Sequence, residues 1–173
     1  MNPPTMTARR YELISRLSRL PKQIISVRDA DYLAELIFCE LCGQNCFNLK
    51  KAAYFLDNPD FDCCRGIVGI SADEFQSPGE ELWADPLSIS DRVRRSPFYQ
   101  KVRALNHASA MKNNSDYVLT EIAKMLGIEH PTFCICDARH ENHAILISDE
   151  RVDDEVSEYL EYGMSILSLC PLV

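Results

Sequence analysis

Five of the eight cysteines of the chain lie between Cys39 and Cys64. Three of them, Cys39, Cys42 and Cys46, follow the spacing C-x2-C-x3-C. Two thiolates separated by two residues are a common way to hold one tetrahedral zinc ion, and Cys63 or Cys64 could supply a fourth ligand. Three thiols with one remote partner would also suit an iron–sulfur cluster. The first chemistry that these residues suggest is therefore that of a metal centre.

The same spacing also fits thiols packed in a hydrophobic core. Offsets of three and seven residues place Cys39, Cys42 and Cys46 on one narrow face of a continuous helix. Cysteine is among the residue types most often buried, and the last two cysteines of the stretch are adjacent, unlike a second zinc-binding pair. We therefore favour packed thiols over a metal centre. Gly43 decides between the two, because a helix that ends there would release Cys46 from this face.

Cys63 and Cys64 are the candidate nucleophiles of a thiol enzyme. They follow a probable turn, Arg65 beside them would favour a thiolate, and Gly66 would allow close approach of the backbone. Cys39 is a poorer candidate, because the C-terminal end of a helix raises a thiol pKa. The simpler interpretation, which we favour, is a strand from which one of the two cysteines points inward and the other outward.

Three aspartates between these cysteines resemble ligands of a calcium ion. An EF-hand loop needs Gly at its sixth position and Glu at its twelfth, but counting from Asn58 these positions hold Cys63 and Gly69. We expect the carboxylates to form turns and to face solvent; they are Asp57, Asp60 and Asp62.

A second group of chemically capable side chains lies in a β-hairpin, over residues 132–137 and 143–148. If residues 138–142 form the turn, Asp137 lies opposite His143 and Cys136 lies opposite Ala144. Side chains alternate across a strand. Cys134 and Cys136 therefore lie on one face of the hairpin and His143 on the other, so they cannot share a metal ion. Asp137 and His143 remain as an acid–base couple or a cross-strand surface pair, and we favour the surface pair.

Helical periodicity dominates the first third of the chain. Leucines recur at helical spacing over residues 8–20, and Pro21 is expected to end that helix. A second helix, capped by Asp29 and ended by Gly43, is apolar nearly all round, so it is either buried on several sides or meets another chain. Residues 49–56 fit a third helix, with a strand as the alternative.

The remaining elements complete an α+β pattern, with N-terminal helices followed by a C-terminal ββαβ unit. Residues 1–7 are expected to fray, and residues 76–89 form a long loop whose tryptophan, Trp83, is expected to fold back onto the core. We predict one domain, with helices packed on a small, mostly antiparallel sheet. The remaining predicted elements are a strand over 64–71, helices from Pro97, over 116–126 and from Asp153 or Asp154 to Tyr162, and a final strand over 164–170.

The formal net charge of −8 argues against a phosphate backbone as partner, despite a local basic group at positions 92–103. No apolar run suits a signal peptide or a membrane span. We therefore expect a cytoplasmic protein with reduced thiols. The first functional hypothesis is a non-catalytic regulatory module that binds a protein partner or itself, as in a homodimer. The alternatives are a zinc or iron–sulfur protein and a thiol enzyme, as described above.

Overall fold

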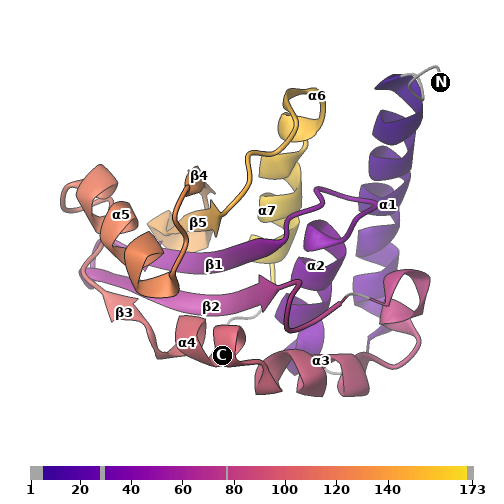
Figure 1. Ribbon diagram of the computed structural model, residues 1–173, viewed down its shortest axis with the longest axis horizontal. Coiled ribbons are helices and arrows are strands. Elements are labelled where there is room, and N and C mark those ends of the chain that lie inside the picture. Colours follow the sequence, from indigo (N-terminus) through magenta and orange to yellow (C-terminus); the bar gives the residue numbers. More distant parts are fainter. Residues whose placement is uncertain (1–5, 28–29, 77, 171–173) are drawn as a thin grey trace.

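The computed structural model describes residues 6–27, 30–76 and 78–170, and this part of the chain forms a five-stranded antiparallel sheet with the strand order β3-β2-β1-β5-β4. β1 lies at its centre and pairs with both β2 and β5 (Figure 1). The strands are β1 (Lys51–Asn58), β2 (Cys63–Ser71), β3 (Asn106–His107), β4 (Thr132–Asp137) and β5 (His143–Ser148).

Helices cover both faces of the sheet, because β1 and β5 bury side chains on both sides. Tyr54 joins one buried cluster, together with residues of α1, α2, α3 and α7. Phe55 joins the other, with residues of α4 and α5. The helices are α1 (Met6–Ser26), α2 (Leu33–Cys42), α3 (Pro86–Arg95), α4 (Pro97–Ala104), α5 (Ser115–Leu126), α6 (Asp154–Ser157) and α7 (Leu160–Ser168), with short 3-10 helices η1 (Ala30–Tyr32), η2 (Gly79–Trp83) and η3 (Arg139–Glu141).

α2 is the central helix of the larger cluster. All of its residues except Ala34 are buried, and it packs against β2, α3, η2 and α7. Of the two alternatives for this all-round apolar helix, burial within its own chain is the one that the structure shows. The predicted cap, Asp29, lies outside the described residues.

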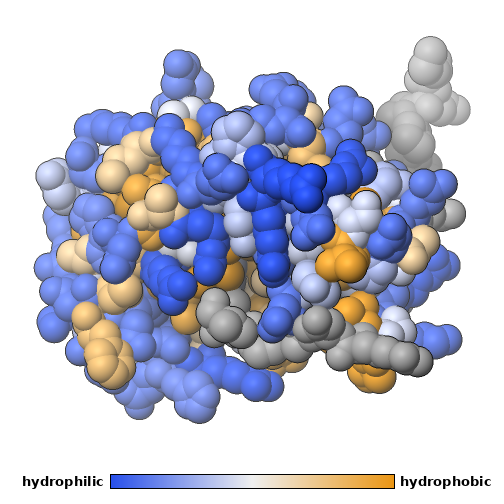
Figure 2. All heavy atoms as spheres, turned by 90° about the horizontal axis from the view of Figure 1, so that it is seen from below, coloured by the Kyte–Doolittle hydropathy of each residue, from blue (hydrophilic) through white to orange (hydrophobic). Residues whose placement is uncertain are grey.

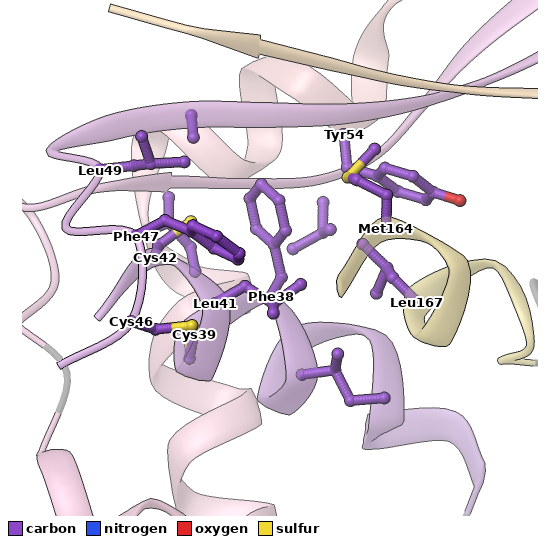
Figure 3. Packing of buried hydrophobic residues seen from close by; sticks show 14 of the residues in the cluster. Phe38, Cys39, Leu41, Cys42, Cys46, Phe47, Leu49, Tyr54, Met164 and Leu167 are labelled. Carbon is purple, nitrogen blue, oxygen red and sulfur yellow. The ribbon is translucent and has the colours of Figure 1, made fainter. Parts of the chain in front are cut away.

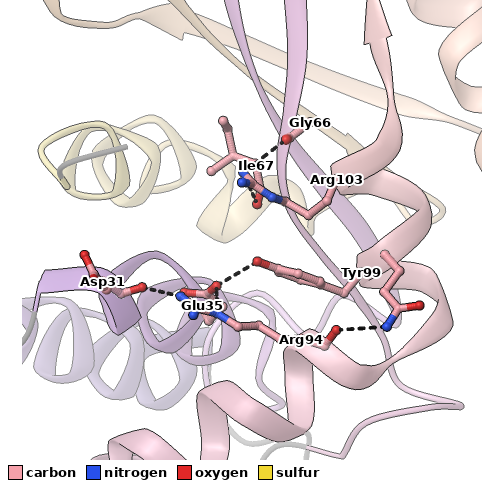
Figure 4. Close-up of polar contacts among 8 residues, drawn as sticks. Asp31, Glu35, Gly66, Ile67, Arg94, Tyr99 and Arg103 are labelled. Carbon is pink, nitrogen blue, oxygen red and sulfur yellow. Dashed lines mark hydrogen bonds and ion pairs between the residues drawn. The ribbon is translucent and has the colours of Figure 1, made fainter. Parts of the chain in front are cut away.

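A buried glutamate fixes the first turn of α2 to α3 and α4. Glu35 is 3% exposed, and its Oε1 accepts hydrogen bonds from Arg94 Nε at 2.7 Å and from Tyr99 Oη at 2.8 Å (Figure 4). Arg94 also donates to the carbonyl of Asp31. A buried carboxylate needs such partners because its desolvation is costly. The network therefore fixes the orientation of α2.

The α+β class and the order of N-terminal helices before C-terminal strands are confirmed. The predicted hairpin register is confirmed as well: Asp137 lies opposite His143 and Cys136 opposite Ala144. Two further predictions are correct. One helix begins at Pro97, and another ends at Gly127, whose φ is +70°. β4 is an edge strand of the sheet, and its residues are partly or fully exposed.

Two predicted elements have the wrong type. Residues 51–58 form strand β1, not a helix, because its residues are buried alternately on the two faces of the sheet. Residues 164–170 are not a strand: most of them belong to α7, whose buried residues Leu160, Met164 and Leu167 recur at helical spacing. Gly163 lies inside this helix, where a Cβ would come within 2.9 Å of Leu41. It allows close packing and does not end the helix.

Two predicted boundaries also differ. α1 continues through Pro21 to Ser26, although proline removes a hydrogen bond in the interior of a helix, because Ile24 beyond it packs against the core. The segment 76–89 contains η2 and the first turn of α3. Within it, Trp83 packs against the core as expected. Residues 1–5 of the segment expected to fray lie outside the described residues.

Most of the lower face of the molecule, where α3 and α4 lie, is hydrophilic (Figure 2). The apolar side chains visible on it form small, separate groups. Arg92, Arg94 and Arg95 occupy the last turn of α3, where positive charge interacts favourably with the helix dipole. This face therefore offers no broad apolar surface to a partner.

Candidate functional site

A pocket of about 460 Å³ opens beyond the C-terminal end of α2. Its volume lies within the range of small-ligand and side-chain sites. The walls come from α1, the end of α2, the connection to β1, and the connection from β2 to η2. The lining residues are Arg16, Cys39, Glu40, Cys42, Gly43, Gln44, Asn45, Asn48, Leu49, Lys50, Ile70, Ala72, Asp73, Phe75, Gln76 and Gly79.

The pocket exists because α2 stops at Cys42 and the chain folds back over the helix end. Gly43 takes an extended conformation, with φ −60° and ψ 157°. Phe47 N–H then donates to the carbonyl of Leu41, and Leu49 N–H to that of Cys42. Carbonyls that the helix leaves unpaired are thereby satisfied. Asn48 adopts a positive φ of 53° in this turn, a conformation that asparagine tolerates better than most residues.

Three clustered thiols form the apolar side of this region. Cys39 and Cys46 lie next to one another and Cys42 lies beside Phe47 (Figure 3). Burial is the main cause that raises the pKa of each thiol; Glu35 and Glu40 raise that of Cys39 further. Protonated, buried thiols are weak nucleophiles. They serve here as small apolar groups.

The five cysteines proposed as metal ligands do not come together. β1 and β2 form a hairpin in which Lys51 lies opposite Ser71 at one end and Asn58 lies opposite Cys63 at the other. Cys63 and Cys64 are therefore separated from the α2 end by the length of β1, about 20 Å at the usual rise per residue. Within residues 6–27, 30–76 and 78–170, no three His, Cys, Asp or Glu side chains are grouped as a metal site would require.

The candidate nucleophiles alternate across β2 as the favoured interpretation predicted. Cys64 is fully buried, and burial, followed by the charge of Asp57, raises its pKa. Cys63 is half-buried, and its thiol donates to Asn106 Oδ1 at 3.0 Å. Arg65, the residue after Cys64, is exposed. The chemistry of a reactive thiol needs a lowered pKa, which the surroundings of Cys64 oppose.

A row of polar side chains crosses the sheet at this end, which sequence reasoning did not find. His107, Cys64, Asp57, His143 and Asp137 lie opposite one another on successive strands. Directly paired residues share a face of the sheet. The row therefore brings together cysteine, histidine and aspartate, the residue types of a catalytic set. The geometry of the row is not that of a catalytic set. In the described part of the chain, no hydrogen bond joins either histidine to Cys64, and His143 Nε2 lies 3.8 Å from Asp137 Oδ1.

Asp57 of this row holds a loop. Its carboxylate accepts hydrogen bonds from Ser109 Oγ at 2.8 Å and from the backbone N–H of Ala110 at 2.7 Å. The expectation that Asp57 faces solvent is therefore wrong, because it is fully buried. Asp60 and Asp62 are exposed in the turn, as expected.

A second buried glutamate, Glu40, lines the pocket. It is 7% exposed; its Oε1 accepts from Arg16 at 2.9 Å and its Oε2 from Trp83 Nε1 at 3.2 Å. Arg16 and Glu40 also line a smaller neighbouring pocket of about 260 Å³, together with Arg19, Gln23, Gly79 and Trp83. Sequence reasoning missed both glutamates of α2. The signal was present, since each interrupts an otherwise apolar helix that must satisfy any charge it buries.

No protein-family model matches the chain, and neither a curated protein nor a solved structure resembles it significantly. Among the described helices, none combines the length and the apolar character needed to span a bilayer.

Proposed function

We propose that this protein is a non-catalytic protein-binding module, and that it binds a segment of its partner in the pocket beyond α2. The observation that carries the proposal is the chemistry of the pocket wall. Four side-chain amides line the pocket on exposed positions, and no hydrogen bond of theirs occurs among the described residues; they are Gln44, Asn45, Asn48 and Gln76.

An amide side chain matches a polypeptide backbone. It offers both an N–H donor and a carbonyl acceptor, which is the combination that each peptide unit needs when it leaves water. Recognition of extended peptides rests on such main-chain hydrogen bonds together with pockets for side chains. Leu49, Ile70 and Phe75 supply the apolar part of the lining. The pocket thus suits a peptide better than a purely apolar ligand.

The reactive groups of the pocket support binding over catalysis. Arg16 is paired with Glu40, and Lys50 with Glu150 at 2.7 Å. Cys39 and Cys42 have raised pKa values because they are buried. Asp73 is the remaining ionisable group of the lining and is exposed, whereas a nucleophile or general acid needs a suitably activated group. We place the module in the cytosol, which its eight free cysteines support.

Selection of peptides tests this function. A phage-displayed library of random twelve-residue peptides is selected on the protein, and the affinity of synthetic binders is measured by the fluorescence of Trp83, the single tryptophan of the chain. Combined Gln44→Ala, Asn45→Ala and Gln76→Ala substitutions should weaken binding about a hundredfold, because each removes a hydrogen bond of about 1 kcal/mol.

The matched control is Gln100→Ala, an exposed amide on α4 outside the pocket, which should leave the affinity unchanged. The proposal fails if the protein selects no binding peptide, or if the triple variant binds as well as the natural protein. Light scattering on the concentrated protein tells whether the partner is a second copy: a dimer that the triple variant disrupts identifies self-association, and a monomer identifies another protein.

A further inference from the structure

The smaller pocket adds a charge to this binding surface. Its lining shares Arg16, Glu40 and Gly79 with the larger pocket, so the two are direct neighbours. Arg16, Arg19 and Gln23 follow one another at offsets of three and four residues on α1, which places them on one side of the helix. Leu13, Leu17 and Leu20 are buried in the core. The polar side of α1 therefore forms a wall of the smaller pocket.

The charges of Arg16 and Glu40 are already compensated. Glu40 uses one oxygen for Arg16 and the other for Trp83. Arg16 also lies 3.9 Å from Glu12. Glu40 is therefore not available to a ligand without breaking an internal contact, which at a largely buried carboxylate is costly, and the positive charge of Arg16 is balanced by Glu40.

Arg19 is different. It lines the smaller pocket and is exposed, and no carboxylate or other acceptor pairs with it in the described part of the chain. Gln23 and the indole of Trp83 complete the polar lining. An arginine with a free guanidinium presents a rigid fork of donors whose geometry matches a carboxylate. The smaller pocket thus holds an uncompensated positive charge.

We infer that the partner segment carries an acidic side chain and that Arg19 binds it in the smaller pocket. This inference rests on the proposed function and names the chemistry of its ligand: an acidic peptide, whose backbone is held by the amides of the larger pocket. The smaller pocket, at about 260 Å³, lies below the usual range for drug-sized ligands and suits a single side chain.

Charge reversal tests the inference. Peptides selected on the natural protein should be enriched in Asp or Glu at one position, and those selected on Arg19→Glu should be enriched in Lys or Arg at that position. For a synthetic binder, replacing the acidic residue by its amide should weaken binding to the natural protein about twofold to fivefold, as expected for an exposed ion pair. The same replacement should have no effect on Arg19→Ala.

Lys22→Ala provides the matched control. Lys22 is an exposed cation of α1 that lines neither pocket, so this variant should keep the preference for acidic peptides. Binding peptides without acidic enrichment, or with equal affinity for the natural protein and Arg19→Ala, would overturn the inference and leave the proposed function intact. Failure to select any binding peptide would instead overturn the proposed function itself.

Discussion

At the level of single residues, Asp57 is the side chain whose role depends most on distant partners. Its carboxylate accepts from Ser109 and Ala110, more than fifty positions later in the chain. Asp57→Asn replaces one acceptor oxygen by an amide group that donates, and this group would face the donors of Ser109 and Ala110. We expect a loss of about 3 kcal/mol in the free energy of unfolding, measured with urea, because buried groups lose their partner and cannot regain water.

Asp60→Asn is the control for this change. Asp60 is exposed in the turn that follows β1, and surface substitutions of this kind shift stability by less than about 0.5 kcal/mol. Equal effects of the two substitutions would contradict the role assigned to Asp57.

The sequence placed correctly those candidate residues whose signal is local. The alternation of Cys63 and Cys64 and the pairing of Asp137 with His143 follow from strand geometry over a few residues. The partner of Glu40 on α1 and that of Glu35 on α3 lie 24 and 59 positions away. Such pairs are set by tertiary packing, which no local pattern encodes.

At the level of elements, the packing of α4 on β2 depends on two glycines. A Cβ at Gly66 would come within 1.9 Å of the backbone carbonyl oxygen of Val102, and one at Gly69 within 2.4 Å of the Val102 side chain. Both Gly66→Ala and Gly69→Ala should therefore lower the free energy of unfolding by about 2 kcal/mol or more, because overpacking forces neighbouring groups apart.

Combination with Val102→Ala separates the two cases. It should recover part of the stability of Gly69→Ala, whose clash is with a side chain, and much less of that of Gly66→Ala, whose clash is with backbone. Denaturant unfolding of the single and double variants gives the two coupling energies. Equal recovery in both pairs would show that α4 does not approach β2 as closely as described.

The sequence predicted elements well where periodicity and turn residues agreed. Residues 132–148 combine alternation with a polar turn, and the hairpin forms with the expected register. Prediction failed where both faces of an element are buried. Ala52 to Phe55 face two cores, so the polar positions that distinguish a strand from a helix are missing. Gly163 shows a different limit: glycine often follows a helix, but here it lies inside α7 and permits close packing.

At the level of the whole molecule, the many buried thiols make stability depend on pH. Burial raises the pKa of Cys39, Cys42, Cys46 and Cys64, and raises that of Cys170 to about 11, from an ordinary value of 9.0. A group with a raised folded-state pKa contributes stability that is present below its unfolded pKa and lost as the pH rises toward the folded value. The sensitive range therefore begins near pH 9 and extends upward.

At pH 10 each of these five thiols should favour the unfolded chain by roughly 1 kcal/mol, so that together they lower the free energy of unfolding by several kcal/mol. Because domains are stable by about 5 to 15 kcal/mol, the protein should be clearly less stable at pH 10.5 than at pH 9. Urea unfolding under reducing conditions at several pH values measures this loss. Cys42→Ala removes one of the protons released on unfolding. The free energy of unfolding should then fall less steeply with pH, by about 1.4 kcal/mol per pH unit, whatever the effect of the substitution at pH 7. An unfolding free energy that is the same at pH 7 and pH 10 would mean that these thiols are not buried in the folded protein.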